Sequence, residues 1–227
     1  MKPLIFAACD VGYYNLYGKA LQNSAVANGM ECLIHCTGKM VDSERSKVEH
    51  NVLRYLMLPD LLKKCPAILV LDTDSIINEP IEINDKYDVG LFLRLGYTDI
   101  RKKTMGSAFY ITDRATDFAD DLKRRMSNIH SWFDDQAAIY KSYQKYFNRY
   151  KFKIFGPSFI NWHCLPAPIW TGKGKVKSNS IAYMALQARW EGVDGNGADR
   201  VAQELHPVLE AAKEIPNDMR SLEGAIS

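Results

Sequence analysis

The sequence has no long apolar segment and no large excess of charge of one sign. No window approaches the roughly 20 apolar residues that span a bilayer, and the N-terminal apolar run stops at Asp10, too early for a signal peptide. The 29 basic and 27 acidic residues give a formal net charge of +2, so no overall field favours nucleic acid. We therefore expect a cytoplasmic protein with no transmembrane segment and no nucleic-acid partner.

Paired cysteine motifs are also missing. The five cysteines are odd in number and form no CxxC pair, which argues against a disulfide framework. Cys32, His35 and Cys36 are close in sequence, but their segment, MECLIHC, is also typical of a strand. Since no second Cys/His cluster completes a tetrahedral zinc site, we expect buried free thiols in a reducing compartment.

The chain does contain alternating apolar strands and amphipathic helices. Its 227 residues are 47% hydrophobic, which suits one globular domain with a sizeable core. The pattern predicts strands at 3–10, 31–38 and 67–74, separated by helices near 17–30 and 48–64. This order predicts an α/β fold with a mostly parallel central sheet. Ligands of such sheets bind beyond the carboxyl ends of the strands, where Asp10, Asp72 and Asp74 would converge.

The second part of the chain continues this pattern. Further strands are predicted at 88–95, 105–112, 151–162 and 167–175, with helices at 114–126 and 133–147. Residues 178–227 have a helical pattern. We expect one domain over residues 1–177 and a helical extension, 178–227, packed on it.

The segment AILVLDTDSIIN, at 67–78, closes a buried strand with two aspartates one residue apart. At a strand-to-turn junction both carboxylates can reach one ion. Mg²⁺ and Mn²⁺ take oxygen ligands and share their coordination with substrate phosphates. Asp72 and Asp74 are therefore candidate metal ligands. The alternative is a turn in which the two side chains only cap backbone amides.

The longer segment RYLMLPDLLKKCPAILVLDTDSIINEPI resembles nucleotide-sugar glycosyltransferases of the GT-A fold, most closely the retaining, glycogenin-like group. Three later segments resemble the same group in the same order: GSAFYI at 106–111, FDDQAAI at 133–139 and IWTGKGKVK at 169–177. The resemblance covers residues 1 to about 177.

This resemblance implies a GT-A (Rossmann-like) sheet flanked by helices. It implies transfer of a hexose from a nucleoside diphosphate sugar, first of all a UDP-sugar, with Mn²⁺ or Mg²⁺. The acceptor would be a hydroxyl of a glycan, a lipid-linked sugar or a protein. The resemblance leaves open whether the protein forms a homo-oligomer.

The resemblance also assigns roles to residues. Contacts to the nucleotide and its diphosphate are implied for Ala8, Asp10, Tyr13, Arg54, Asp72, Thr73, Gly172, Lys173 and Lys177. Contacts to the reacting sugar, the acceptor or the leaving group are implied for Asp135, Gln136 and Lys173. The structural alternatives are a solvated helix arginine at 54, a solvated basic turn at 173–177 and helix N-terminal charges at 134–135.

One departure concerns the metal. The group usually has a histidine, the third metal ligand, just before the terminal Thr-Gly-Lys stretch, and Trp170 stands there instead. An indole cannot ligate the ion. Either the metal keeps an extra water, or His163 reaches it from the segment NWHC, or binding is weak.

Two rival functions follow from this departure and from the fold class. One is a catalytically weak or inactive transferase-like protein that binds a nucleotide sugar. The other is a sugar nucleotidyltransferase, which would carry a glycine-rich basic signature after the first strand. The segment AACDVGYYN lacks that signature.

Overall fold

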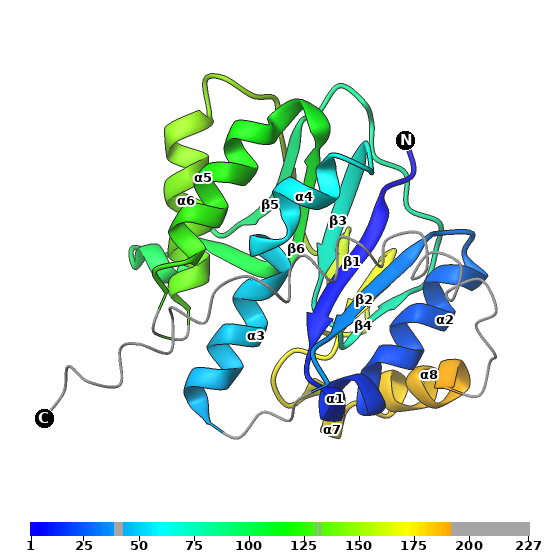
Figure 1. Ribbon diagram of the computed structural model, residues 1–227. Coiled ribbons are helices and arrows are strands. Elements are labelled where there is room, and N and C mark those ends of the chain that lie inside the picture. Colours follow the sequence, from blue (N-terminus) through cyan, green and yellow to red (C-terminus); the bar gives the residue numbers. More distant parts are fainter. Residues whose placement is uncertain (39–42, 130, 132, 192–227) are drawn as a thin grey trace, which may run out of the picture.

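The computed structural model describes residues 1–38, 43–129, 131 and 133–191. Its centre is a six-stranded sheet of order β2-β1-β3-β6-β5-β7 (Figure 1). The strands are β1 (Leu4–Cys9), β2 (Cys32–Cys36), β3 (Ala67–Leu71), β5 (Val89–Leu93), β6 (Thr104–Thr112) and β7 (Phe152–Phe155). Only β6 runs against the others, because it is antiparallel to both β3 and β5 while the remaining pairs are parallel. The predicted α/β fold with a mostly parallel sheet is confirmed.

Helices connect these strands, as predicted for crossovers between parallel strands. They are α1 (Val11–Tyr13), which runs through a π-helical turn at 14–18 into α2 (Lys19–Ala27), then α3 (Glu44–Leu56), α4 (Leu58–Leu62), α5 (Thr116–Met126), α6 (Asp134–Tyr146), α7 (Val176–Asn179) and α8 (Ile181–Glu191). Ser43 and Ser46 form a reciprocal capping box that begins α3. Pro59 lies in the first turn of α4, so the predicted 48–64 helix is divided into α3 and α4.

Two apolar layers enclose the sheet. Alternate residues of β1 point to opposite faces: Leu4 and Phe6 join the core under α3 to α6, whereas Ile5 and Ala7 join the core under α2. Figure 1 shows α3 to α6 as the cyan and green helices, and α2 as the blue helix near β2. All of β3, at 67–71, is buried because both of its faces are covered, which explains its uninterrupted apolar sequence.

A second, three-stranded sheet brings distant segments together next to the end of β3. It consists of β4 (Ser75–Ile77), β9 (Ile169–Thr171) and β8 (Ile160–Asn161), in the order β4-β9-β8. Ser75 of β4 pairs with Thr171 of β9 in antiparallel register. The loop after β9 is thereby placed beside Asp74, whose carbonyl accepts a hydrogen bond from the Gly172 amide at 2.8 Å.

The beginning of the predicted C-terminal extension packs against α2. Asn23 donates to the Trp190 carbonyl at 2.6 Å, and Gln187 donates to the Leu16 carbonyl at 2.7 Å. The expected boundary after residue 177 falls within α7, and residues 192–227 of the predicted extension lie outside the described residues. Among the helices that are described, none has the length and apolar character needed to cross a membrane.

Candidate active site

A cavity of about 560 Å³ opens at the carboxyl ends of β1 and β3. It is lined by Ala8, Cys9, Asp10 and Tyr13 from β1 and α1; by Lys47, His50, Asn51 and Arg54 from α3; by Asp72, Thr73 and Asp74 after β3; by Met105, Gly106 and Ser107 from β6; by Phe133, Asp135 and Gln136 around the start of α6; and by Lys173, Gly174 and Lys177 from the terminal loop. The predicted convergence of Asp10, Asp72 and Asp74 on one sheet edge is confirmed.

Arg54 enters this cavity from α3 and forms an ion pair with Asp72. Only 3% of Arg54 is exposed, and its second amino group donates to Asn51 Oδ1 at 2.6 Å. Burial by itself would lower the pKa of the guanidinium, but Tyr55 and the Asp72 carboxylate raise it, so the group stays charged. A buried charge needs such a partner. The alternative of a solvated helix arginine is therefore wrong.

Asp74 is held by groups from three separate parts of the chain. The Tyr13 hydroxyl donates to its Oδ2 at 2.6 Å, and the Lys177 ammonium donates to the same oxygen at 3.0 Å. The Thr171 hydroxyl donates to Oδ1 at 3.4 Å. Burial and the negative charge of Asp74 raise the pKa of Tyr13, so its phenol keeps the proton that it donates.

Lys177 is fixed in this position by aromatic rings as well as by Asp74. Its ammonium lies 4.7 Å from the ring centroid of Tyr13 and 5.2 Å from that of Tyr17, and it also donates to the Tyr13 hydroxyl. A cation over aromatic rings is attracted by their electron-rich faces. Lys177 is therefore part of an ordered cluster and not of a solvated basic turn.

The start of α6 contributes Asp135 and Gln136. Asp135 is 4% exposed and accepts a hydrogen bond from Asn51 at 2.8 Å. Burial raises the pKa of its carboxyl group, although Arg54 partly opposes the rise. Gln136 accepts from Arg94 at 2.7 Å, which holds its side chain in the cavity wall.

Gly106 keeps space open between these groups. A Cβ atom at this position would lie 3.0 Å from Asp135 Oδ2, 3.0 Å from the Tyr55 hydroxyl and 3.4 Å from an amino group of Arg54. Any side chain would have to displace this network. The glycine of the segment GSAFYI is thus required by close approach to the charged groups.

Lys173 completes the positive side of the cavity. Burial lowers the pKa of its ammonium, and the nearby Asp72 carboxylate opposes that effect. Its Nζ lies 5.7 Å from the ring centroid of Trp162. Lys173, Lys177 and Arg54 together bring three cationic groups to a cavity that holds the Asp72 and Asp74 carboxylates.

Two predicted site residues lie outside this lining. The first is Gly172, whose amide donates a hydrogen bond to the Asp74 carbonyl. A Cβ atom at Gly172 would lie 2.8 Å from the Tyr183 hydroxyl. His163 lines a different cavity, of about 310 Å³, together with Trp162, Lys175, Asn179 and Ser180. In the described part of the chain, no three His, Cys, Asp or Glu side chains are grouped so as to hold a metal ion.

The third residue beside the aspartates is Thr171 and not Trp170. The Trp170 indole points elsewhere and donates to the Leu165 carbonyl at 2.8 Å. A threonine hydroxyl is an oxygen donor that suits hard cations, although it is uncharged. The residue that faces Asp74 from the terminal segment is thus one position later than the resemblance implied.

Several site residues were not predicted. Lys47 and Asn51 precede Arg54 by seven and three positions, which places all three on one face of α3, and this spacing was a usable signal. Tyr183, whose hydroxyl donates to the Asp74 carbonyl at 2.7 Å, gave no local signal. Ser107 Oγ and Arg54 Nε are buried without a hydrogen-bond partner among the described residues.

Comparisons with known proteins place this fold. No family model and no curated protein matches the sequence. Among solved structures, a glycosyltransferase involved in glycosylation of the major capsid of PBCV-1 aligns with a TM-score of 0.54 at 12% identity, over 84% of this chain and 100% of that one. GlyE, a glycosyltransferase of Streptococcus pneumoniae TIGR4, aligns with a TM-score of 0.57 at 10% identity, over 92% of this chain.

A third solved structure, the WbbM bifunctional glycosyltransferase, aligns with a TM-score of 0.54 at 9% identity over 83% of this chain. This chain spans 64% of the length of GlyE and 51% of that of WbbM. At such identities the likeness concerns the fold. The chain therefore has the fold of these glycosyltransferases.

Proposed function

We propose that this protein is a glycosyltransferase that moves a hexose from a nucleoside diphosphate sugar, a UDP-sugar first of all, to an acceptor hydroxyl. The observation that carries the proposal is the cavity at the carboxyl ends of β1 and β3, where Arg54, Lys173 and Lys177 meet Asp72 and Asp74. A diphosphate with two or more negative charges matches three converging cations. The shared fold with glycosyltransferases supports the sugar as the transferred group.

In this proposal the diphosphate lies against the terminal loop. Lys173 and Lys177 supply compact positive charges, and Arg54 adds a third cationic group beside Asp72. The nucleoside lies along Ala8, Asp10 and Tyr13, by resemblance.

The reaction breaks the bond between the sugar C1 and the diphosphate oxygen, and it forms a bond from C1 to the acceptor oxygen. Negative charge grows on the leaving diphosphate, where Lys173 and Lys177 stabilise it. Asp135 and Gln136 accept and donate hydrogen bonds to hydroxyls of the donor sugar or the acceptor. The raised pKa of Asp135 makes its carboxylate a stronger acceptor for such a hydroxyl. Retention of the anomeric configuration is part of the proposal.

The residues fit a divalent cation in one respect. Asp72 uses only Oδ1 for Arg54, and no described residue bonds its Oδ2. One or two carboxylates plus substrate phosphates commonly suffice for Mg²⁺. Asp74 would have to exchange the Lys177 ammonium, 3.0 Å away, for the ion. A bound Mn²⁺ or Mg²⁺ would add positive charge at the leaving diphosphate.

A panel of nucleoside diphosphate sugars, each with and without Mn²⁺, tests the proposal. We expect one donor to raise the Tm of the protein and to release its nucleoside diphosphate slowly into water, and faster with an acceptor. The anomeric configuration of the product, determined by NMR, tests retention. If no donor shifts the Tm and none releases nucleotide, the proposed function is wrong.

A second candidate function is a nucleotide-sugar binding protein without transfer activity. It is favoured by Thr171, an uncharged side chain, as the third group beside the aspartates, and by protein cations that already pair with both carboxylates. This candidate predicts donor binding in the thermal-shift experiment with no nucleotide release above the rate in buffer.

A further inference from the structure

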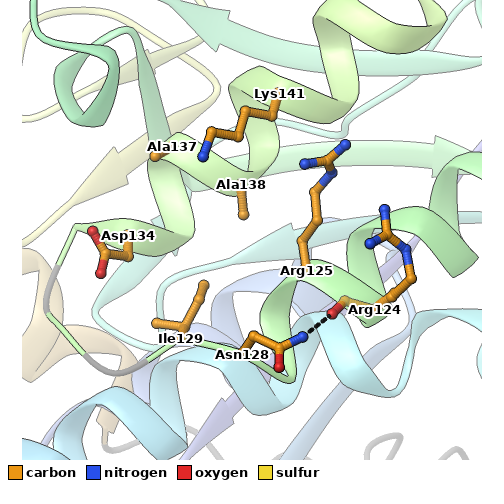
Figure 2. A pocket seen from close by; sticks show the side chains of 8 residues that line it. All are labelled: Arg124, Arg125, Asn128, Ile129, Asp134, Ala137, Ala138 and Lys141. Carbon is orange, nitrogen blue, oxygen red and sulfur yellow. Dashed lines mark hydrogen bonds between the residues drawn. The ribbon is translucent and has the colours of Figure 1, made fainter.

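A second charged cavity lies between α5 and α6, apart from the candidate active site. It has a volume of about 400 Å³ and is lined by Arg124, Arg125, Asn128, Ile129, Asp134, Ala137, Ala138 and Lys141 (Figure 2). We call it the α5–α6 pocket. Its four residues from α6 are spaced at i, i+3, i+4 and i+7, so they share one helix face, and Asp135 and Gln136 point away from that face.

The charge of the α5–α6 pocket is predominantly positive. Among the described lining residues, Arg124, Arg125 and Lys141 are cationic and Asp134 is the one carboxylate. Figure 2 shows the two arginine side chains rising from α5, and the lysine side chain extending from α6 on the side of Ala137. Among the described residues none forms an ion pair with Lys141. A cavity with this excess of cations favours an anion.

Arg124 and Arg125 are both held in place by the Asp121 carboxylate. Asp121, whose side chain is 2% exposed, accepts from Arg124 Nη2 at 2.7 Å and from Arg125 Nε at 2.7 Å. A guanidinium has five N–H donors, so each arginine keeps donors for a further partner. Since Asp121 also pairs with Lys145 at 2.8 Å, it cannot neutralise all the cations around it.

The remaining described lining consists of Asn128 and three apolar residues. Ile129, Ala137 and Ala138 are buried, and the two alanines leave the space that larger side chains would fill. The volume of about 400 Å³ lies within the range of about 300 to 1,000 Å³ typical of small-molecule pockets. It therefore has room for more than a bare ion, with apolar surface for the carbon skeleton of a sugar.

The α5–α6 pocket and the candidate active site meet at the first turn of α6. Asp134 lines the former, while the next two residues, Asp135 and Gln136, line the latter. A molecule anchored in the α5–α6 pocket would have to extend past the first turn of α6 to reach the residues that we assign to the reacting sugars.

We infer that the α5–α6 pocket binds the phosphate group of a phosphorylated sugar, and that this sugar is the acceptor. The phosphate would be held by Lys141 and by the free edges of Arg124 and Arg125, because planar guanidinium groups match the oxygens of a phosphate. The acceptor assignment rests on the proposed function, whereas the binding of a sugar phosphate does not.

The test titrates the full chain with glucose 6-phosphate, glucose and inorganic phosphate, followed by NMR chemical shifts and calorimetry. We expect glucose 6-phosphate to bind at least about tenfold more tightly than glucose or inorganic phosphate, with shifts in α5 and α6. In Lys141→Gln this affinity should fall by about tenfold, as expected for the loss of a charged hydrogen bond. Lys123→Gln removes a neighbouring charge on α5 that lies outside the pocket and should change nothing.

Ala137→Met offers a second test that leaves the charges in place. The longer side chain fills the pocket, so binding should fall while the circular dichroism spectrum stays that of the wild type. Arg125→Lys keeps the positive charge beside Asp121 but removes the planar guanidinium group with its paired N–H donors. It should weaken the binding of glucose 6-phosphate more than the binding of inorganic phosphate.

Nucleotide release from the donor separates this inference from the proposed function. With glucose 6-phosphate present, we expect faster release from wild type and a loss of that stimulation in Lys141→Gln, whose release without acceptor is unchanged. The inference is overturned if glucose 6-phosphate does not bind, or if Lys141→Gln and Ala137→Met bind it as tightly as the wild type does. It is also overturned if a donor is active and bound glucose 6-phosphate does not speed the release of its nucleotide. If no donor is active but binding follows the pocket variants, the proposed function fails and the phosphate site stands.

Discussion

Asp121 and the pair Asp72 and Asp74 each lie beside cationic groups, and they differ in how completely the carboxylate oxygens are used. Asp121 accepts two hydrogen bonds at each carboxylate oxygen, from Arg124 and Lys145 at Oδ1 and from Arg125 and Ser142 at Oδ2. All four donors come from α5 and α6. This cluster ties two neighbouring helices together.

The Asp72 and Asp74 pair has a different character. Its partners come from α1, α3, β9 and α7, and Asp72 keeps one oxygen without a described partner. Arg54 Nε and Ser107 Oγ nearby are also unpaired among the described residues. A carboxylate whose oxygens are all used by two neighbouring helices has a structural role, whereas a carboxylate oxygen left open at a cavity is available to a ligand.

Asp74→Asn should have the largest effect. The amide removes the negative charge that holds Lys177 and that a metal would need, so we expect donor turnover to fall by about 10²- to 10³-fold. The circular dichroism spectrum should remain that of the wild type. Asp120→Asn, on the exposed side of α5, is the control for loss of one carboxylate. Full turnover of Asp74→Asn with Mn²⁺ present would contradict the assignment.

Asp121→Asn should produce the opposite pattern. A buried carboxylate with four partners loses its charge, so the free energy of unfolding should fall by about 2 to 3 kcal/mol. Urea denaturation measures this value, and donor binding at low temperature should equal that of the wild type. If Asp121→Asn lost much of its donor binding while its free energy of unfolding stayed unchanged, the structural role of Asp121 would be wrong.

Lys173→Gln should have a smaller effect on turnover than Asp74→Asn. One of three cations near the diphosphate is lost, so we expect about a tenfold lower rate of nucleotide release. Lys175→Gln, in the same loop but lining the other cavity, is the matched control. Equal losses in both variants would indicate a diffuse charge effect instead of a specific contact.

The smallest expected effect is the loss, at low pH, of the stability that Asp121 contributes. Burial would raise the pKa of Asp121, but the hydrogen bonds from Lys145, Arg125, Arg124 and Ser142 lower it below its ordinary value. A lowered folded pKa stabilises the protein above the unfolded pKa of about 3.9, and this contribution is lost as the pH falls below it. The stability difference between wild type and Asp121→Asn should therefore shrink below about pH 4 in urea titrations. A constant difference would contradict the lowered pKa.

Much of the fold could be predicted because it depends on local pattern. The run AILVL marks a strand buried on both faces, and the alternation of strands and helices requires parallel crossovers. The convergence of Asp10 with Asp72 and Asp74 follows from that topology. The strand at 105–112 was predicted, but the antiparallel direction of β6 and the short strand β4 could not be predicted, since their partners lie far away in sequence.

The identity of the third group at Asp74 shows the limit of local pattern. In the β4–β9 register Thr171 pairs with Ser75 and Trp170 with Ile76. Successive side chains of a strand point to opposite faces, so a shift of one residue would exchange the two. Nothing in the segment IWTGKGKVK specifies that register, which depends on packing in the second core.

By itself, then, the sequence determined most of the segments that become strands and helices, and it determined that Asp10, Asp72 and Asp74 end near one sheet edge. Only the tertiary structure decided which partners meet: Lys177 with Tyr13 and Asp74, Asp135 with Asn51, and Tyr183 with the Asp74 carbonyl. The physical reason is that secondary structure follows from short-range periodicity, whereas a charged cluster depends on the long-range packing that buries it.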